Sequence, residues 1–225
     1  MKRTATLLLI LLALPLQAAW ATPIVIGSGS SLNGFPFGEV SGPIAYVGEY
    51  QQIYLSTAFS GPVFIHQIAF ESAALGTLVD TFTLGLGTTS ATPSDPGTTY
   101  AGNKRQDFTQ VFSGTVVTTL MGGSAFDLVI NLDDPFLYDP GAGNLLLDMF
   151  LTGASGNGAP FKAGISTDVG RLFNAGGTGS PTATSDFGLL TQFDVTQSQT
   201  PEPVTLTLVG IGLAGGVMVR KRSKT

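Results

Sequence analysis

Apolar and polar residues alternate at a spacing of two over much of the chain between Thr22 and Thr200, and no stretch there has a convincing 3.6-residue apolar period. A period of two places successive side chains on opposite faces of a β-strand. The clearest example is segment 125–132, in which four apolar side chains would face a core: Phe126, Leu128, Ile130 and Leu132. The pattern therefore predicts an all-β domain.

The composition supports this prediction and narrows the architecture. The chain has 30 Gly and 13 Pro, which disfavour helices and suit short strands joined by tight turns. It has no Cys, so no disulfide can stabilise it, but a domain of this size can bury about 70% of the surface of its unfolded chain. We expect an antiparallel β-sandwich of the jelly-roll type over residues 22–195, followed by a polar linker over 196–200.

The expected strands follow from the apolar runs and the turn residues between them. They are 43–47, 51–59, 63–70, 77–86, 107–120, 125–132, 144–151, 161–167, 171–174 and 186–195. Segment 63–70 follows 51–59 across a Ser60-Gly61-Pro62 turn, so these two strands are expected to pair. Segment 107–120 is expected to be a hairpin that turns at Ser113-Gly114. Segment 144–151 is more apolar, which predicts that both of its faces are covered.

The N-terminus has the features of a secretory signal peptide. Lys2 and Arg3 precede an apolar run over 7–16, and Ala19 and Ala21 supply the small residues of a signal-peptidase site. We expect cleavage after Ala21, so residues 1–21 would be removed and the mature chain would begin at Thr22.

The C-terminus combines a proline-flanked start, an uncharged run over 204–219 and a basic end. Sixteen residues form a helix of roughly 24 Å, which is short for about 30 Å of bilayer hydrocarbon. Basic side chains just after the run can reach the lipid head groups and mark a cytoplasmic end. The segment therefore predicts a short membrane-directed helix with a basic tail over 220–225; a buried core helix is the less favoured alternative.

The order Pro201-Glu202-Pro203, apolar helix, Arg220-Lys221-Arg222 resembles the PEP-CTERM sorting signal of Gram-negative bacteria that make exopolysaccharide. The resemblance implies recognition by a membrane-embedded exosortase, cleavage near Pro-Glu-Pro and delivery to the cell surface or extracellular matrix, after a transient stage in the inner membrane. Parts of the domain also look like a group of PEP-CTERM ectodomains, which implies no reaction: 65–70, 81–92, 126–130, 135–140 and 143–148.

Charge excludes some partners of the mature domain. Between Thr22 and Thr200 the chain has four basic and fourteen acidic residues, which gives a net charge of −10. Nucleic acid and anionic lipid both require basic patches on a protein that binds them. We expect neither as a partner of this domain.

Four carboxylates near one tight turn are candidate calcium ligands. Tyr138-Asp139-Pro140-Gly141 has strong turn chemistry, and three other aspartates lie close in sequence: Asp133, Asp134 and Asp148. Calcium takes six to eight oxygen ligands, but this spacing does not match an EF-hand loop. We favour an ordinary turn whose carboxylates face water, and so expect no cofactor, with calcium as the alternative.

The remaining residues indicate no catalytic set. Two carboxylates can hydrolyse a glycosidic bond, but no motif selects a pair. His66 is the only histidine, on a strand face expected to include Phe64 and Ile68, so a core or edge role is favoured. Five tyrosines are available to stack on sugars: Tyr46, Tyr50, Tyr54, Tyr100 and Tyr138.

The sequence therefore predicts an exported, non-enzymatic surface or matrix protein with exopolysaccharide as a candidate partner. Signal peptidase and an exosortase-type protease would process it. The alternatives are a carbohydrate-binding module and, less favoured, a secreted glycoside hydrolase.

Overall fold

The computed structural model describes residues 22–37, 48–123, 126–156, 159–174 and 180–198. These residues form an all-β protein whose neighbouring strands are antiparallel throughout, which confirms the predicted fold class. The signal segment 1–21, the expected strand 43–47 and the tail 199–225, with its expected helix 204–219, lie outside the described residues. Within the described ranges, no helix is long and apolar enough to span a membrane.

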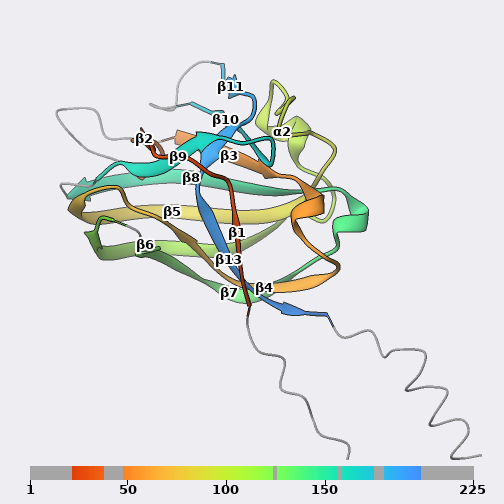
Figure 1. The fold of residues 1–225 in the computed structure, drawn as a ribbon, viewed down its shortest axis with the longest axis horizontal. Coiled ribbons are helices and arrows are strands. Elements are labelled where there is room, and N and C mark those ends of the chain that lie inside the picture. The colour runs from red at the N-terminus through yellow and green to blue at the C-terminus, as the bar shows by residue number, and fades with distance from the viewer. Residues whose placement is uncertain (1–21, 38–47, 124–125, 157–158, 175–179, 199–225) are drawn as a thin grey trace, which may run out of the picture.

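The strands form three sheets (Figure 1). The four-stranded sheet has the order β1 (Thr22–Ile26), β13 (Thr191–Gln197), β4 (Val63–Phe70), β7 (Leu128–Tyr138). The six-stranded sheet has the order β11 (Thr182–Thr184), β10 (Val169–Phe173), β3 (Gly48–Tyr54), β8 (Asn144–Gly156), β5 (Leu75–Thr89), β6 (Thr109–Met121). The three-stranded sheet has the order β12 (Phe187–Leu189), β9 (Phe161–Ile165), β2 (Ser31–Asn33). Three short helical turns interrupt the strands: η1 (Ser56–Ala58), α2 (Tyr100–Asn103) and η2 (Pro140–Ala142).

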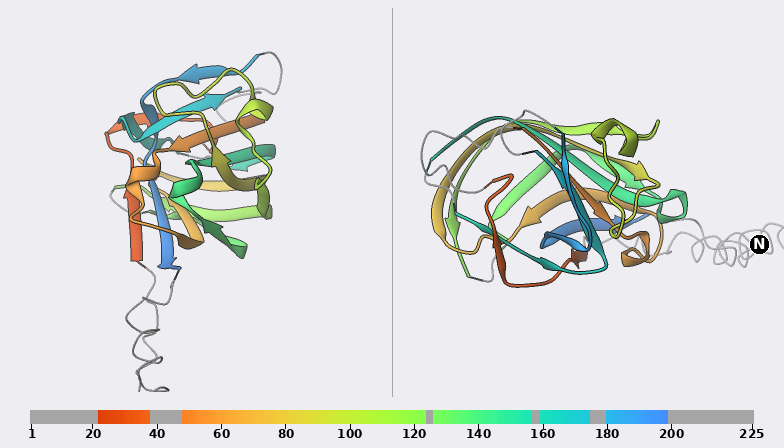
Figure 2. Two further views of the ribbon diagram at one scale, coloured as in Figure 1. Left: turned by 90° about the vertical axis from the view of Figure 1, so that its right-hand side faces the viewer. Right: turned by 90° about the horizontal axis from the view of Figure 1, so that it is seen from above.

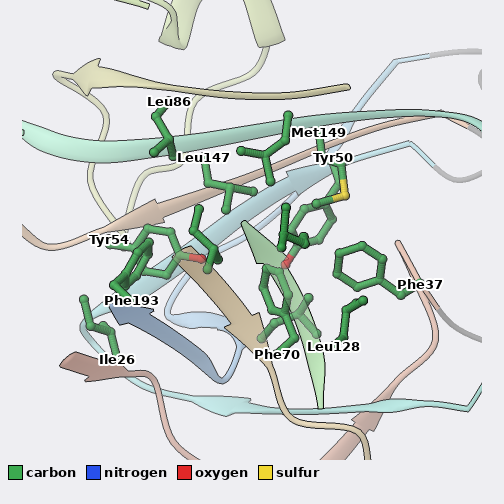
Figure 3. Packing of buried hydrophobic residues seen from close by; sticks show 14 of the residues in the cluster. Ile26, Phe37, Tyr50, Tyr54, Phe70, Leu86, Leu128, Leu147, Met149 and Phe193 are labelled. Atoms are coloured by element: carbon green, nitrogen blue, oxygen red, sulfur yellow. The ribbon is translucent and has the colours of Figure 1, made fainter. Parts of the chain in front are cut away.

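Aromatic side chains join the three sheets in one core (Figure 3). The Phe37 ring lies 4.9 Å from Phe70 of the four-stranded sheet, 5.9 Å from Phe82 of the six-stranded sheet and 5.3 Å from Phe161 of the three-stranded sheet, measured between ring centroids. Tyr54 meets Phe193 edge to face at 4.9 Å. Because each of these rings buries a large apolar area, this cluster supplies much of the stabilisation of a chain without disulfides.

Strand β8 is covered on both faces along its first half, as its apolar composition predicts. Leu145 and Leu147 point into the central core, whereas Leu146 is equally inaccessible but lies on the opposite, outer face of the six-stranded sheet. Ile53 of β3 is the cross-strand partner of Leu146 and is covered in the same way. The outer face of this sheet therefore carries a second, smaller apolar layer.

The expected pairing of 51–59 with 63–70 is wrong. Strand β3 pairs with β8 and β10, whereas β4 pairs with β13 and β7, so the chain changes sheets between them. The turn η1 ends β3 early, and Phe59 packs into the core against Tyr138 and Phe193. The Ser60-Gly61-Pro62 turn therefore joins strands of two different sheets instead of closing a hairpin.

The expected hairpin in 107–120 is also wrong, because β6 continues through Ser113-Gly114 without a turn. Gly114 is the cross-strand partner of Phe82, and the Phe112 side chain lies where a Cβ on Gly114 would come within 3.4 Å of it. That distance is an ordinary contact, and the pairing with β5 continues on both sides of Gly114, so this glycine is a regular position inside the strand.

The two ends of the described domain lie side by side. Thr22, the first residue of β1, is the cross-strand partner of Val195 near the end of β13 (Figure 1). Strand β13 continues to Gln197, and the Ser198 amide donates to the Pro62 carbonyl over 2.9 Å. The first residues of the expected linker 196–200 therefore belong to the sheet.

Candidate functional site

The long connection between β5 and β6, residues 90–108, covers part of the outer face of the six-stranded sheet, and α2 lies within it (Figure 2). Thr99 begins α2, with its hydroxyl accepting a hydrogen bond from the Gly102 amide over 3.2 Å. The connection can lie this close because Gly85 and Gly87 of β5 have no side chains: a Cβ on either would collide with Phe108. The two glycines thus leave room for the Phe108 ring to pack directly on the sheet.

The packing of Phe108 on the sheet places Lys104 between two carboxylates of the sheet. Lys104 follows α2 directly, and its Nζ lies 3.0 Å from Glu49 Oε1 of β3 and 2.9 Å from Asp148 Oδ2 of β8. Asp148 is only 5% exposed. We call Glu49, Gln51, Lys104 and Asp148 the Lys104 cluster.

Amide hydrogen bonds fix the carboxylate of Asp148. Gln51 is its cross-strand partner and donates from Nε2 to Asp148 Oδ2 over 2.5 Å and to the Tyr100 carbonyl over 3.0 Å. Asn103 in turn donates to Gln51 Oε1 over 2.8 Å and to the Pro96 carbonyl over 2.9 Å. A buried side-chain amide with hydrogen-bond partners for both its oxygen and its nitrogen is held in one orientation. This network therefore fixes the position of the β5–β6 connection on the sheet.

Burial and charge alter the titration of two members of the cluster. Burial, followed by repulsion from Asp148, raises the pKa of Glu49. Burial alone would lower the pKa of Lys104, but hydrogen bonding and attraction from Asp148 and then Glu49 raise it. Glu49 therefore takes up a proton at a higher pH than an exposed glutamate does, while Lys104 stays positively charged in the ion-paired state.

Two hollows adjoin the cluster and share Glu49 and Lys104. One, of about 220 Å³, is lined also by Thr83, Phe108, Gln110 and Phe150. The other, of about 360 Å³, is lined also by Thr99, Tyr100, Ala101 and Pro181. Phe150 is 46% exposed, so an aromatic ring faces solvent next to hydrogen-bonding side chains.

The four candidate calcium ligands occupy different environments. Asp133 and Asp134 are exposed on β7, Asp139 accepts a hydrogen bond from the Gly141 amide over 2.8 Å, and Asp148 belongs to the Lys104 cluster. The part of the chain that the structure describes contains no group of three or more His, Asp or Glu side chains able to hold a metal ion. The structure thus does not join these aspartates into one metal site.

Most of the candidate sugar platforms are unavailable to a ligand. Tyr50, Tyr54 and Tyr138 are 0% exposed in the core. Tyr100 is half-buried and donates from its hydroxyl to the Glu49 carbonyl over 2.8 Å. Tyr46 lies outside the described residues. Tyr100 borders the second of the two hollows.

His66 lies on the outer face of the four-stranded sheet and does not share a face with Ile68, contrary to the expectation from sequence. A bulge between Ile65 and Gln67 shifts the register of β4, so that His66 shares the outer face with Phe64 while Ile68 points inward. Its Nε2 lies 2.8 Å from Thr196 Oγ1. His66 is therefore half-buried on the outer face of an internal strand, and lies neither in the core nor on an edge strand.

Sequence reasoning missed the Lys104 cluster as a site. Its one available signal was charge: Lys104 and Arg105 are two of the four basic residues between Thr22 and Thr200. In so acidic a domain, a lysine is expected to be surrounded by carboxylates, but the pattern does not tell which ones. That choice depends on the strand order, which brings Glu49 and Asp148 from strands 99 residues apart in sequence to neighbouring positions.

Comparisons with known proteins add no assignment: no family model matches the chain, and no curated protein matches it.

Proposed function

We propose that the chain is an exported, non-enzymatic protein of the cell surface or extracellular matrix. Its β-sandwich domain, of jelly-roll type, would be delivered by the PEP-CTERM-like tail over 201–225 after loss of the signal peptide 1–21. One observation supports the proposal: the strands between the two expected targeting segments, from β1 to β13, pack around one hydrophobic core. The folded unit thus fits between the two targeting segments.

The position of the termini suits display from a membrane. Since β1 and β13 are neighbours, the signal and the tail would both join the domain at the same end. In Figures 1 and 2, α2 lies at the other end of the molecule, away from the start of β1. A domain held by its tail would therefore direct the Lys104 cluster and its hollows outward.

The Lys104 cluster supports a role other than glycoside hydrolysis. The two carboxylates of a glycosidase must flank a scissile bond. Lys104 Nζ lies within 3.0 Å of both Glu49 and Asp148, so the lysine fills the space that such a bond would need. This favours the non-enzymatic proposal over the hydrolase alternative.

Intact-mass analysis of the protein isolated from its cells tests the proposal. We expect a chain that begins at Thr22 and ends near Pro201-Glu202-Pro203, recovered from the outer surface or the matrix. A variant with Arg220, Lys221 and Arg222 all replaced by Gln should keep its tail and stay in the inner membrane. A wild-type mass that includes Thr225 would contradict processing of the tail.

A carbohydrate-binding role is the second candidate, favoured by the exposed Phe150 ring between hydrogen-bonding side chains. Sugars bind to proteins by stacking on aromatic rings and by hydrogen bonds to polar side chains. Phe150→Ala should weaken retention of the purified protein on the organism's own exopolysaccharide. Phe64→Ala, on the outer face of the other large sheet, is the matched control, and equal retention of wild type and Phe150→Ala would exclude this surface.

A further inference from the structure

We propose that Lys104 Nζ and Asp148 Cγ condense to an intramolecular amide, with Glu49 as the proton relay, so that a covalent link joins the β5–β6 connection to the central strand β8. This modification is independent of where the protein is delivered. It rests on the positions of the three side chains and on their surroundings.

The reacting groups are already held in contact. Lys104 Nζ lies 2.9 Å from Asp148 Oδ2, and Gln51 holds that same oxygen with a hydrogen bond of 2.5 Å. Glu49 Oε1 lies 3.0 Å from the same Nζ, close enough to exchange a proton with it. When two groups are fixed in contact, a reaction between them gains an effective concentration of many molar, which makes an otherwise slow condensation possible.

The cluster is partly shielded from water, although its carboxylates and the Phe108 ring favour the charged form of Lys104. Asp148 is nearly inaccessible to water, and the Phe108 ring centroid lies 4.9 Å from Lys104 Nζ. Burial of an ammonium and a carboxylate carries a desolvation cost that a neutral amine and carboxylic acid do not carry. The neutral amine is the minor form of Lys104, because the two carboxylates raise its pKa. It arises when one proton passes from Lys104 to Asp148, which gives the neutral pair without changing the total charge and leaves Glu49 able to accept a proton.

The step balances with no external reagent. The free electron pair of Nζ attacks Asp148 Cγ, forming the C–N bond. Glu49 takes a proton from the nitrogen and returns it to the departing oxygen, so one C–O bond of the carboxyl group breaks and a water molecule leaves. The Gln51 amide donates to the oxygen on which negative charge develops. The sum is an ammonium and a carboxylate converted to one amide and one water.

The link would do for this chain what a disulfide does in other exported proteins. The chain has no Cys, and its β5–β6 connection is held to the rest of the domain by non-covalent contacts, among them the amide network and the Phe108 contact. An amide between residues 104 and 148 would close a covalent loop across three strands: β6, β7 and part of β8.

Mass spectrometry of the protein isolated from its cells tests the inference. Digestion with several proteases should yield a branched peptide that joins the segments carrying Lys104 and Asp148, lighter by about 18 Da, one water, than the two separate peptides. Peptide masses are used because they do not depend on how the termini are processed. Separate, unmodified peptides in the wild-type protein would overturn the proposal.

Variants assign the roles of the three residues. Lys104→Arg and Asp148→Ala should give only separate peptides, and Glu49→Gln should reduce the linked fraction at least tenfold while leaving both reacting groups in place. The matched control is Lys162→Arg, which alters the other Lys–Glu pair, Lys162 with Glu71, and should keep the link. A linked peptide in Lys104→Arg, or full linkage in Glu49→Gln, would contradict the mechanism.

Discussion

The side-chain amide of Gln52 pairs with both backbone groups of Leu189. Gln52 Oε1 accepts from the Leu189 amide over 2.8 Å, and Gln52 Nε2 donates to the Leu189 carbonyl over 2.9 Å. Strand β12 ends at Leu189, and β13 begins two residues later in a different sheet. Gln52, a residue of the six-stranded sheet, thus makes the two hydrogen bonds that a neighbouring strand would otherwise make to Leu189. It does so where the chain passes from the three-stranded to the four-stranded sheet.

Replacement of Gln52 by Leu should destabilise the domain by about 2–5 kcal/mol. The change leaves the Leu189 amide buried without its partner, and such a group costs about 1–3 kcal/mol. The Leu189 carbonyl loses one of its two donors and keeps the Thr191 hydroxyl at 3.0 Å. The Tyr50 hydroxyl also loses its acceptor, Gln52 Oε1, at 2.5 Å. The measurement is the free energy of unfolding in urea.

The matched control is Gln67→Leu. Gln67 donates to Asn131 over 2.7 Å on the exposed face of the four-stranded sheet. Water can replace this bond, so we expect a loss below about 0.5 kcal/mol. Equal losses in the two variants would mean that Gln52 does not act through the backbone of Leu189.

Gly85→Ala should destabilise the domain by about 1–3 kcal/mol, the usual cost of an added methyl group in a packed site. A Cβ at Gly85 would collide with the Phe108 ring, so the β5–β6 connection would have to move off the sheet. We expect a lower melting temperature and faster proteolysis within residues 90–108. Gly61→Ala is the control, since no atom lies within 4 Å of its added Cβ. An equal loss of stability in Gly61→Ala would mean that the collision with Phe108 is not the cause.

The fold class was predictable from sequence because it depends on local pattern. Strand β4 lies at the expected residues, 63–70, because β-branched and aromatic residues there are bounded by turn signals. The partners of β4 were not predictable. Partner choice depends on contacts between distant segments, here on Phe59 filling a site between Tyr138 and Phe193, and a turn dipeptide carries no information about such contacts.

The candidate site was hidden for the same reason. The sequence places Asp148 near Asp139 and Pro140, which made it a candidate ligand in the less favoured calcium alternative. In the structure its neighbours are Gln51 of β3 and Lys104 of the β5–β6 connection. A strand also alternates faces, so the side chain of Asp148 leaves the sheet on a side that its sequence neighbourhood does not reveal.

Millimolar calcium should leave the melting temperature of the protein unchanged. Asp148 already has Lys104 and Gln51 as partners, and Asp139 is engaged by the Gly141 amide. Calcium would have to displace these contacts and still gather six or more oxygens. Thermal unfolding with and without calcium, with magnesium as the control cation, makes the measurement; a rise with calcium alone would restore the metal site.

Asp80→Asn should stabilise the protein at pH 8 and leave it nearly unchanged at pH 4. Asp80 lies on β5, 3% exposed, and the described residues provide no hydrogen-bond partner for its Oδ2.

Burial raises the pKa of Asp80 from 3.8 to about 7. The folded protein therefore holds this proton more tightly than the unfolded chain, and stability falls as the pH rises from about 4 to about 7. Asparagine carries no charge, so the variant should lose this fall and be more stable than wild type by about 2 kcal/mol at pH 8. This is half of the full effect at about 1.4 kcal/mol per pKa unit, because relaxation of the protein around a buried charge reduces its cost. Urea unfolding at a series of pH values gives both curves, with the exposed Asp133→Asn as the control. Parallel curves for wild type and Asp80→Asn would show that Asp80 does not carry the pH dependence.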